Sequence, residues 1–553
     1  MPSDPRLAAR FAGMSPYLFR DLLIGHARLT RGQAAPLLDA TREAPNWQQR
    51  DVQLAWHVLG LYCDYVYGVV GDPGNVRLIP KSAPVDHAAA FSRFADGLMD
   101  LRESLAIGTD FLSELWPYLA QKVLVGRSES DIIDAFTQAM SGGAYPSPAT
   151  LDFAAPIVTR YLAGKLFRGD TALAGEFAVH LTAGTSAGWV QVAQTLAANR
   201  LLLPGDKVAL VLPTYQPLAE LFARQLGCEI VGLAGDVAQG FEPSSEELAR
   251  LSDPAVKLLA LMSPSDPASL STAPETLARL EPLLRRRPDL LVMADYSGAN
   301  LLASPKLTAL QRWPRQTIGL YGFAHDFGLA GARLGAVLVH RDCIADELLA
   351  GLPATTQAEV GSRYAGRLVQ PTTAKFEARL AEESAGVAFG HVAGLAPALQ
   401  VLLCLCASYE AITEPVGATY HEWVRQELGR RRVALYRGLE LLPPDLGPAA
   451  ANHCLLLDLQ DVALALDPTL AIGLEGTDVW AALFHLAHAT GVIVMPALPC
   501  GAGLWSVRIP LVGLGESDCL ATGKAIRSCL YALGTNTPCP DCEQLHRLNG
   551  SAS

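Results

Sequence analysis

The chain has 553 residues, of which 50% are apolar and 18% are charged, and its formal net charge is −12. This length exceeds one ordinary hydrophobic core, and the composition is that of a globular protein rather than a disordered one. The acidic balance argues against a nucleic-acid-binding protein, which would present a basic face.

Residues 1–150 form the first predicted region, which we expect to be helical because its apolar residues recur at intervals of three and four. The stretches "SPYLFRDLLIGHARL" and "DVQLAWHVLGLYCDYV" carry this pattern. The opening "MPSDPRLAARF" lacks the apolar core of a signal peptide. We therefore expect a cytoplasmic protein.

Residues 151–385 are predicted to form a large α/β domain. Short apolar runs alternate with helical stretches here, beginning with "KVALVL", "CEIVGL" and "VKLLALM" and continuing through "DLLVMAD", "TIGLYGF" and "LGAVLVH". Alternation of this kind is typical of a mostly parallel sheet that is wrapped by helices.

Residues 386–535 are predicted to contain a linking helix and a smaller α/β domain. The apolar run "HVAGLAPALQVLLCLCASYEA" includes a histidine and a glutamine, which indicates a buried core or interface helix rather than a membrane span. The runs "HCLLLDL", "GVIVMPA" and "LWSVRIPL" indicate the strands of the smaller domain.

Residues 536–553 are predicted to be a tail. It contains "CPDCEQLH", in which Cys539, Cys542 and His546 have a spacing that suits zinc. No clear fourth ligand accompanies them, so the preferred interpretation is a solvent-exposed tail without metal. The 11 cysteines of the chain are scattered and odd in number, which indicates reduced thiols.

A candidate anion site lies in "VHLTAGTSAGWVQ", which has the order strand, loop, helix. Gly184, Thr185 and Ser186 lie where the helix begins, and free backbone N–H groups there favour an anion, although such residues also serve as plain caps. Later strands end in "PTY", "SPSDP" and "MADYSGAN", and "GFAHDFGLAGARLG" follows. Open α/β sheets bind ligands at such carboxyl ends.

The order and spacing of these segments resemble the fold-type-I pyridoxal phosphate (PLP) enzymes, the aspartate aminotransferase superfamily. Within it the chain looks most like bacterial aspartate 4-decarboxylases, on the segments "MSPYLFRDLLIGHA", "LLDATREAPNW" and "GGAYPSP". The resemblance implies an α/β fold: a large domain with a mostly parallel seven-stranded sheet, a smaller C-terminal α/β domain and an added helical N-terminal region.

The resemblance also implies cofactor-binding roles. Gly184, Thr185 and Ser186 match the phosphate-binding loop, and Tyr215 matches the aromatic residue that stacks on the pyridine ring. Arg333 matches the arginine that pairs with the cofactor phosphate, for which a guanidinium fork is well suited.

Two further matches concern the partner subunit and the substrate. Tyr145 in "GGAYPSP" matches a tyrosine that reaches the phosphate of the partner subunit, which implies a homodimer. Arg508 in "SVRIPLVGL" matches the arginine that holds the α-carboxylate of a small amino-acid substrate in a bidentate pair.

Three positions depart plainly from the family pattern. His325 stands where the family has its Schiff-base lysine, and Gly322 stands where it has a phosphate-binding serine. Asp266 replaces an asparagine that bonds the phenolic oxygen of the ring, so it would bring a negative charge close to a phenolate.

The acid that pairs with the pyridine nitrogen is a fourth point of departure. Asp295 is the candidate, but it lies one residue later than expected when Gly298 sets the register. In that register Ala294 takes the place of the acid, and Ser297 takes the place of a tyrosine that bonds the phenolic oxygen. Losing the acid would weaken the electron sink on which PLP chemistry depends.

Without the lysine, the cofactor has no covalent link to the protein, and PLP or pyridoxamine phosphate (PMP) would bind noncovalently. Lys257 and Lys306 are predicted to be surface residues that do not substitute for it. The imidazole of His325 is suited to proton transfer. The alternative is that His325 is a polar filler in a pocket that is no longer catalytic.

These observations leave three hypotheses open. The first, which we prefer, is an aminotransferase-like or aspartate 4-decarboxylase-like enzyme that acts on an aspartate-like amino acid with noncovalent PLP or PMP and with His325 as candidate base. The second is a catalytically degenerate relative with a regulatory or assembly role. The third is a cofactor-independent lyase with Asp266 and His325 as an acid–base pair.

Overall fold

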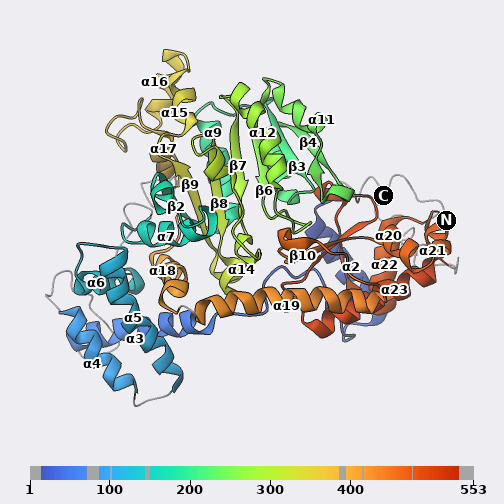
Figure 1. Ribbon diagram of the computed structural model, residues 1–553, viewed down its shortest axis with the longest axis horizontal. Coiled ribbons are helices and arrows are strands. Elements are labelled where there is room, and N and C mark those ends of the chain that lie inside the picture. Colours follow the sequence, from blue (N-terminus) through green and yellow to red (C-terminus); the bar gives the residue numbers. More distant parts are fainter. Residues whose placement is uncertain are drawn as a thin grey trace.

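The computed structural model describes residue 11 and residues 14–70, 86–99, 103–142, 150–384, 394–413, 416–475 and 477–534. Tyr145 and the tail residues Cys539, Cys542 and His546 therefore lie outside the described residues. The molecule has a central sheet with helices on both sides, a helical body at one end and a small lobe at the other (Figure 1).

The central sheet has eight strands in the order β2-β9-β8-β7-β6-β3-β4-β5. Their bounds are Phe177–Ala183 (β2), Lys207–Leu212 (β3), Glu229–Asp236 (β4), Glu242–Pro243 (β5), Val256–Met262 (β6), Leu291–Asp295 (β7), Thr317–Gly322 (β8) and Leu334–His340 (β9). The expected mostly parallel sheet is confirmed. The sheet has eight strands rather than the seven expected, because the two-residue β5 adds an antiparallel strand beside β4. The other antiparallel strand is β9, which runs opposite to both of its neighbours.

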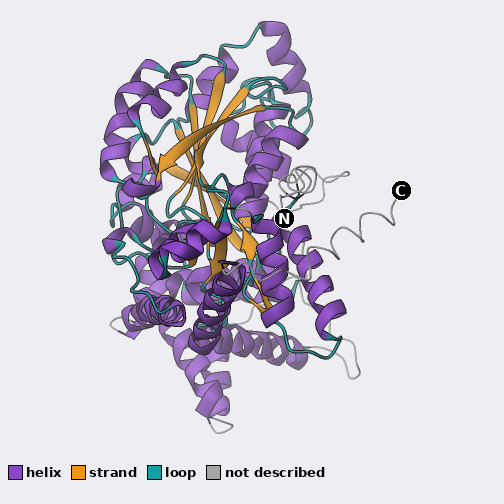
Figure 2. Ribbon diagram, turned by 90° about the vertical axis from the view of Figure 1, so that its right-hand side faces the viewer, coloured by secondary structure: helices purple, strands orange, loops and turns teal. Residues whose placement is uncertain are grey.

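The central strands are buried on both faces, which explains their almost continuous apolar sequence. All residues of β8 and β9 are buried. One face packs against α9 (Thr185–Ala198) and α17 (Phe376–Ser384), and the other packs against α7 (Ala154–Leu166) and α12 (Pro274–Arg286). Figure 2 shows the strands as a twisted layer with helices around it.

The helices of the N-terminal region divide between two parts of the molecule. Four of them, which form the helical body, are α3 (Arg50–Val70), α4 (His87–Met99), α5 (Glu103–Lys122) and α6 (Glu129–Ser141). The body shares a core with α7 and with α18 (Pro397–Ile412). In contrast, α2 (Pro16–Arg31) packs into the core of the small lobe. The helical character expected for this region is confirmed, and the boundary at residue 150 stays a prediction.

The small lobe contains a three-stranded antiparallel sheet in the order β10-β13-β12. Its strands are Cys454–Asp458 (β10), Met495–Pro496 (β12) and Ser506–Pro510 (β13). Helices α20 (Leu459–Leu466), α21 (Pro468–Leu474), α22 (Val479–Thr490) and α23 (Glu516–Gly534) surround it. The long α19 (Val416–Leu439) runs from the side of the helical body to the small lobe and lies beside α23 (Figure 1).

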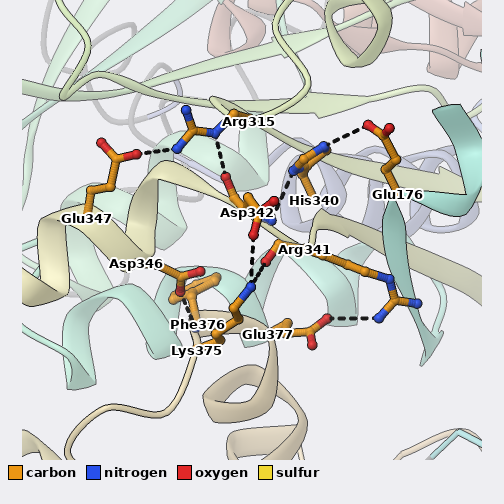
Figure 3. Close-up of polar contacts among 10 residues, drawn as sticks. All are labelled: Glu176, Arg315, His340, Arg341, Asp342, Asp346, Glu347, Lys375, Phe376 and Glu377. Atoms are coloured by element: carbon orange, nitrogen blue, oxygen red, sulfur yellow. Dashed lines mark hydrogen bonds and ion pairs between the residues drawn. The ribbon is translucent and has the colours of Figure 1, made fainter.

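A polar network holds the end of β9 that lies away from the candidate site (Figure 3). In it, the Lys375 ammonium donates to Asp342 Oδ1 at 2.9 Å. The Phe376 N–H, at the start of α17, donates to Asp346 Oδ1 at 2.6 Å. Its other members are Glu176, Arg315, His340, Arg341, Glu347 and Glu377. A negative carboxylate at a helix start stabilises the helix, so the network fixes α17 against the sheet.

The apolar run expected to be a core helix is α18, whose residues from Gln400 to Tyr409 are all buried. Among the helices in the described part of the chain, none has both the length and the apolar character that a bilayer crossing demands. No disulfide joins any two of the nine described cysteines, all of which are buried.

Candidate functional site

The candidate site is a cavity of about 330 Å³ at the carboxyl ends of the central strands, where α/β sheets bind ligands. The predicted site residues that line it are Gly184, Thr185, Ser186, Tyr215, Asp266, Asp295, His325 and Arg333. Arg508 contacts Asp266 directly. Tyr145 is not among the described residues, so its role stays a prediction.

An anion cradle forms where β2 passes through Gly184 into α9. Gly184 has a φ of +82°, and a Cβ added to it would lie 2.7 Å from Arg333 Nη2. Glycine therefore allows the guanidinium to approach the N-terminus of α9 closely. No described carboxylate pairs with the exposed Arg333, whose Nη1 only reaches the Ala330 carbonyl at 3.5 Å. The helix terminus and this guanidinium together suit a phosphate.

A second hydroxyl lies beside the cradle. The Ser297 hydroxyl donates to Thr185 Oγ1 at 3.3 Å. A Cβ added to Gly322 would lie 2.8 Å from Ser297 Oγ, so a serine at position 322 does not fit unless Ser297 moves. Ser297 thus supplies a hydroxyl in the space that a side chain at position 322 would fill.

The acid at the end of β7 is Asp295, because it lines the cavity while Ala294 belongs to the apolar core on the other face of the sheet. Its carboxylate accepts from Trp189 Nε1 at 2.9 Å and from the Ser297 N–H at 2.8 Å. Burial raises the pKa of Asp295, and these hydrogen bonds offset part of the rise. Ala294, which the register set by Gly298 would put in the site, does not line the cavity.

Arg508 is held by two carboxylates of the protein itself. Its Nε and Nη2 donate to Asp266 Oδ1 and Oδ2 at 2.9 and 2.7 Å, as a bidentate pair. Its Nη1 donates to Glu43 Oε1. Burial alone would raise the pKa of Asp266, but the charge and hydrogen bonds of Arg508 hold it below its usual value. Asp266 is therefore ionised at neutral pH.

The N-terminal region closes the side of the cavity next to Tyr215. The Tyr17 hydroxyl, on α2, donates to Glu43 Oε1 at 3.0 Å and lies 3.4 Å from the Tyr215 hydroxyl. Glu43 and Ala44 line the cavity directly. Gly328 makes this docking possible, since a Cβ there would lie 1.8 Å from the Trp47 carbonyl oxygen.

His325 lies on α14 (Ala324–Phe327), a single turn that follows β8. Burial lowers its pKa, although the nearby carboxylates, Asp266 first among them, act in the opposite direction. The ring makes no hydrogen bond to any described residue, so its nitrogens are available to a ligand. A neutral imidazole in this position can accept a proton.

A second histidine, His453, lies beside it, with the two ring centroids 5.6 Å apart. Its Nδ1 is 3.1 Å from the Ser269 hydroxyl, which donates to the Cys454 carbonyl at 2.7 Å. Because the hydroxyl proton is given to that carbonyl, Nδ1 of His453 carries the proton in this contact. Burial lowers the pKa of His453 to about 3, so the ring is neutral.

Sequence reasoning did not find Tyr17, Glu43, Trp189 or His453. Trp189 could have been predicted from the sequence, since it follows Gly184 by little more than one helical turn and therefore lies near the same helix end. The other three come from distant parts of the chain, and no local pattern connects them to the cavity. In the described part of the chain, no lysine is among the residues that line the cavity, and Lys257 and Lys306 are half-buried elsewhere.

Comparisons with known proteins agree with this architecture. Residues 150–511 match the family described as aminotransferase class I and II. The chain is 29% identical over 534 residues to a bifunctional aspartate aminotransferase and L-aspartate beta-decarboxylase of a Pseudomonas species, covering 93% of this chain and 96% of that protein. A valine–pyruvate aminotransferase of Mycobacterium tuberculosis is 28% identical over 164 residues, which are 29% of this chain and 40% of the relative.

Solved structures share the fold. An aspartate aminotransferase of Thermus thermophilus with maleate has a TM-score of 0.52 at 21% identity, over 72% of this chain and 87% of that chain. An aromatic aminotransferase of Pyrococcus horikoshii has a TM-score of 0.52 at 16% identity, over 72% and 92%. At these identities the likeness concerns the fold alone.

Proposed function

Because the chain belongs to the aminotransferase class I and II family, we propose that it is an enzyme that binds PLP or PMP without a covalent bond and acts on the amino group of a small compound. One cavity carries the proposal. It has an anion cradle at Gly184 and Arg333, a neutral imidazole at His325 and no lysine among the described residues that line it.

The phosphate end of the cavity fits such a cofactor. Backbone N–H groups at the start of α9 and the hydroxyls of Thr185, Ser186 and Ser297 would hold the phosphate, with Arg333 as its counter-ion. A Cβ at Gly184 would fill the space between the loop and the guanidinium. The chain thus keeps both the donors and the room that a phosphate group needs.

The ring end fits as well. Asp295 would pair with the pyridine nitrogen and Tyr215 would cover a face of the ring, since both line the cavity. Trp189 holds the Asp295 carboxylate in place with its indole N–H at 2.9 Å. When bound, the cofactor supplies an electron-withdrawing ring that stabilises negative charge on the carbon next to the amino group.

His325 would move the proton that the family's lysine moves. Burial keeps its imidazole neutral at pH 7, so a ring nitrogen accepts a proton from the substrate and later returns it. Among the described residues that line the cavity, none has a side-chain amine that could bond covalently to the cofactor. The cofactor would therefore be bound and released through noncovalent contacts alone.

Aspartate is the substrate suggested by the Pseudomonas relative, which acts on it by name. Holding an α-carboxylate requires an arginine that is free to receive it, and Arg508 already pairs with Asp266 and Glu43. The third hypothesis, a cofactor-free acid–base pair of Asp266 and His325, gains no support from this contact, because both Asp266 oxygens are engaged by Arg508.

The test is to titrate the purified protein with PLP and record its absorbance, then treat it with borohydride and weigh the intact chain. We expect saturable binding that dialysis reverses and no mass increase after reduction. His325→Ala should keep PLP affinity and lose at least about a hundredfold in turnover of the amino donor. His57→Ala, an exposed position, is the control. No PLP binding, or a reduced adduct on a lysine, would contradict the proposal.

A further inference from the structure

The Nε and Nη2 edge of the Arg508 guanidinium, which could hold a substrate carboxylate in a bidentate pair, is already occupied by a carboxylate of the protein. A carboxylate normally takes two parallel N–H donors of an arginine, and Asp266 takes the Nε and Nη2 edge at 2.9 and 2.7 Å. Glu43 takes Nη1 from the other side. All three nitrogens therefore already donate to carboxylates of the protein.

The charges around Arg508 also oppose a further anion. Two carboxylates face one guanidinium, so this half of the cavity carries a net negative charge. The half with the anion cradle is positive, because Arg333 and the start of α9 lie there without an acidic partner among the described residues. The cavity therefore suits a ligand whose anionic end is the phosphate and whose other end is neutral or cationic.

Both carboxylates are fixed in place. Arg508 is 6% exposed, and breaking a buried pair by taking away one partner leaves an uncompensated charge. The Tyr17 hydroxyl donates to Glu43 Oε1 at 3.0 Å, which holds Glu43 toward the arginine. Tyr17 and Glu43 both precede residue 150, where the match to the aminotransferase family begins.

We infer that Asp266 and Glu43 fill the place of a substrate α-carboxylate on Arg508, so that the site takes a primary amine without a carboxylate on its amino-bearing carbon. The term substrate rests on the proposed function. The pairing itself does not, since it involves only side chains of this chain. Asp266 and Glu43 are thus the specificity-determining residues of the site, and one of them comes from the added N-terminal region.

The first test asks whether Arg508 is available to an added carboxylate. Maleate binding is measured by calorimetry and by thermal unfolding, with and without PLP, on the unchanged protein, Asp266→Ala and Asp266→Asn. Removing the Asp266 carboxylate frees the Nε and Nη2 edge, so we expect maleate to bind Asp266→Ala at least roughly tenfold more tightly than the unchanged protein and to raise its unfolding temperature. Asp253→Asn, which removes a surface carboxylate paired with Lys207, is the control.

Each outcome of this test decides. Maleate binding to the unchanged protein as tight as to the Asp266 variants, or no maleate binding to any of them, overturns the inference. If Asp266→Ala does not fold, Asp266→Asn keeps an amide beside Arg508 and still loses the charge. If neither variant folds, the unchanged protein decides through the comparison of amines that follows.

The second test compares two amines that differ only by the carboxylate, n-butylamine and 2-aminopentanoate. Each is added to the unchanged protein with bound PLP, and the absorbance change of the cofactor is followed. We expect n-butylamine to act at least roughly tenfold more strongly than 2-aminopentanoate. An equal effect of the two amines, or the reverse preference, overturns the inference. Failure to bind PLP at all is recorded separately in the same samples and contradicts the proposed function instead.

Discussion

Ser297 and Gly322 illustrate how single residues of the site compensate for each other. The family's serine is absent at position 322, yet a hydroxyl remains in that space because Ser297 reaches it from the end of β7 and contacts Thr185 at 3.3 Å. A Cβ at Gly322 would lie 2.8 Å from that hydroxyl. The two positions therefore cannot both carry a serine in the present geometry.

Gly322→Ser should destabilise the protein by about 1 kcal/mol and weaken PLP binding, because the new side chain displaces the Ser297 hydroxyl. The double variant Gly322→Ser with Ser297→Gly should recover both properties, since it returns one hydroxyl to the same space. Urea unfolding and PLP titration measure these effects. Gly331→Ser, where an added Cβ meets nothing within 4 Å, is the control, and equal losses in both single variants would contradict the argument.

Helix α2 is the element that carries the N-terminal region to the site. Phe19 is 1% exposed and packs edge-on against Trp480 at 4.9 Å and Phe484 at 5.6 Å on α22. The same helix presents Tyr17 to Glu43 and Tyr215. Tyr17 lies only two residues from Phe19, which is less than one helical turn. The packing of Phe19 in the small lobe therefore positions the Tyr17 hydroxyl at the cavity.

Phe19→Ala should cost about 3–5 kcal/mol of folding free energy, because it leaves a cavity among aromatic rings. It should also loosen Tyr17 and Glu43, so that maleate, which the unchanged protein is expected to exclude, gains access to Arg508. Thermal unfolding and maleate calorimetry are the measurements. Leu22→Ala changes a residue of the same helix that is 41% exposed and should have little effect on either. A Phe19 variant with unchanged maleate binding would show that the packing of α2 does not control access to Arg508.

The large domain and the small lobe meet next to the cavity. The Ser271 N–H donates to the Ala449 carbonyl at 2.9 Å, and the Ala451 N–H donates to the Ser269 carbonyl at 2.8 Å. His453 continues this junction, since its Nδ1 contacts the Ser269 hydroxyl. The groups that act electrostatically on His453 are Asp266, His325 and Arg508. The charges of the site therefore affect the protonation of a residue at this junction.

Acid should loosen this junction. Burial lowers the pKa of His453 to about 3, below its unfolded value of about 6.5. The unfolded chain therefore binds the extra proton first, and the stability that the neutral ring preserves is lost as pH falls from about 6.5 toward 3. His453→Gln should reduce the loss between pH 7 and about pH 4.5 by about 2–3 kcal/mol in urea unfolding. His57→Gln, an exposed position, should leave the loss unchanged, and an identical pH slope in His453→Gln would contradict the assignment.

Much of the architecture could be predicted because its signals are local. Apolar runs identified every long strand of the central sheet from β3 to β9, and a glycine at a helix start indicated the anion cradle. The two-residue β5 escaped notice because so short a strand has no periodicity. The position of the acid was ambiguous because Ala294 and Asp295 are adjacent at the end of a strand. The sequence contains nothing that says which of the two side chains faces the cavity.

The chain order of motifs was enough to identify the fold, the cavity wall and the absence of a lysine at position 325, since each depends on residues close together in sequence. Only the tertiary structure decided what Arg508 binds. Its partners Asp266 and Glu43 lie 242 and 465 positions away along the chain. A contact over such distances follows from the packing of the sheet, the small lobe and α2 around one cavity. Charge pairing at this range leaves no pattern in a single sequence, because any acidic residue in the chain could in principle supply it.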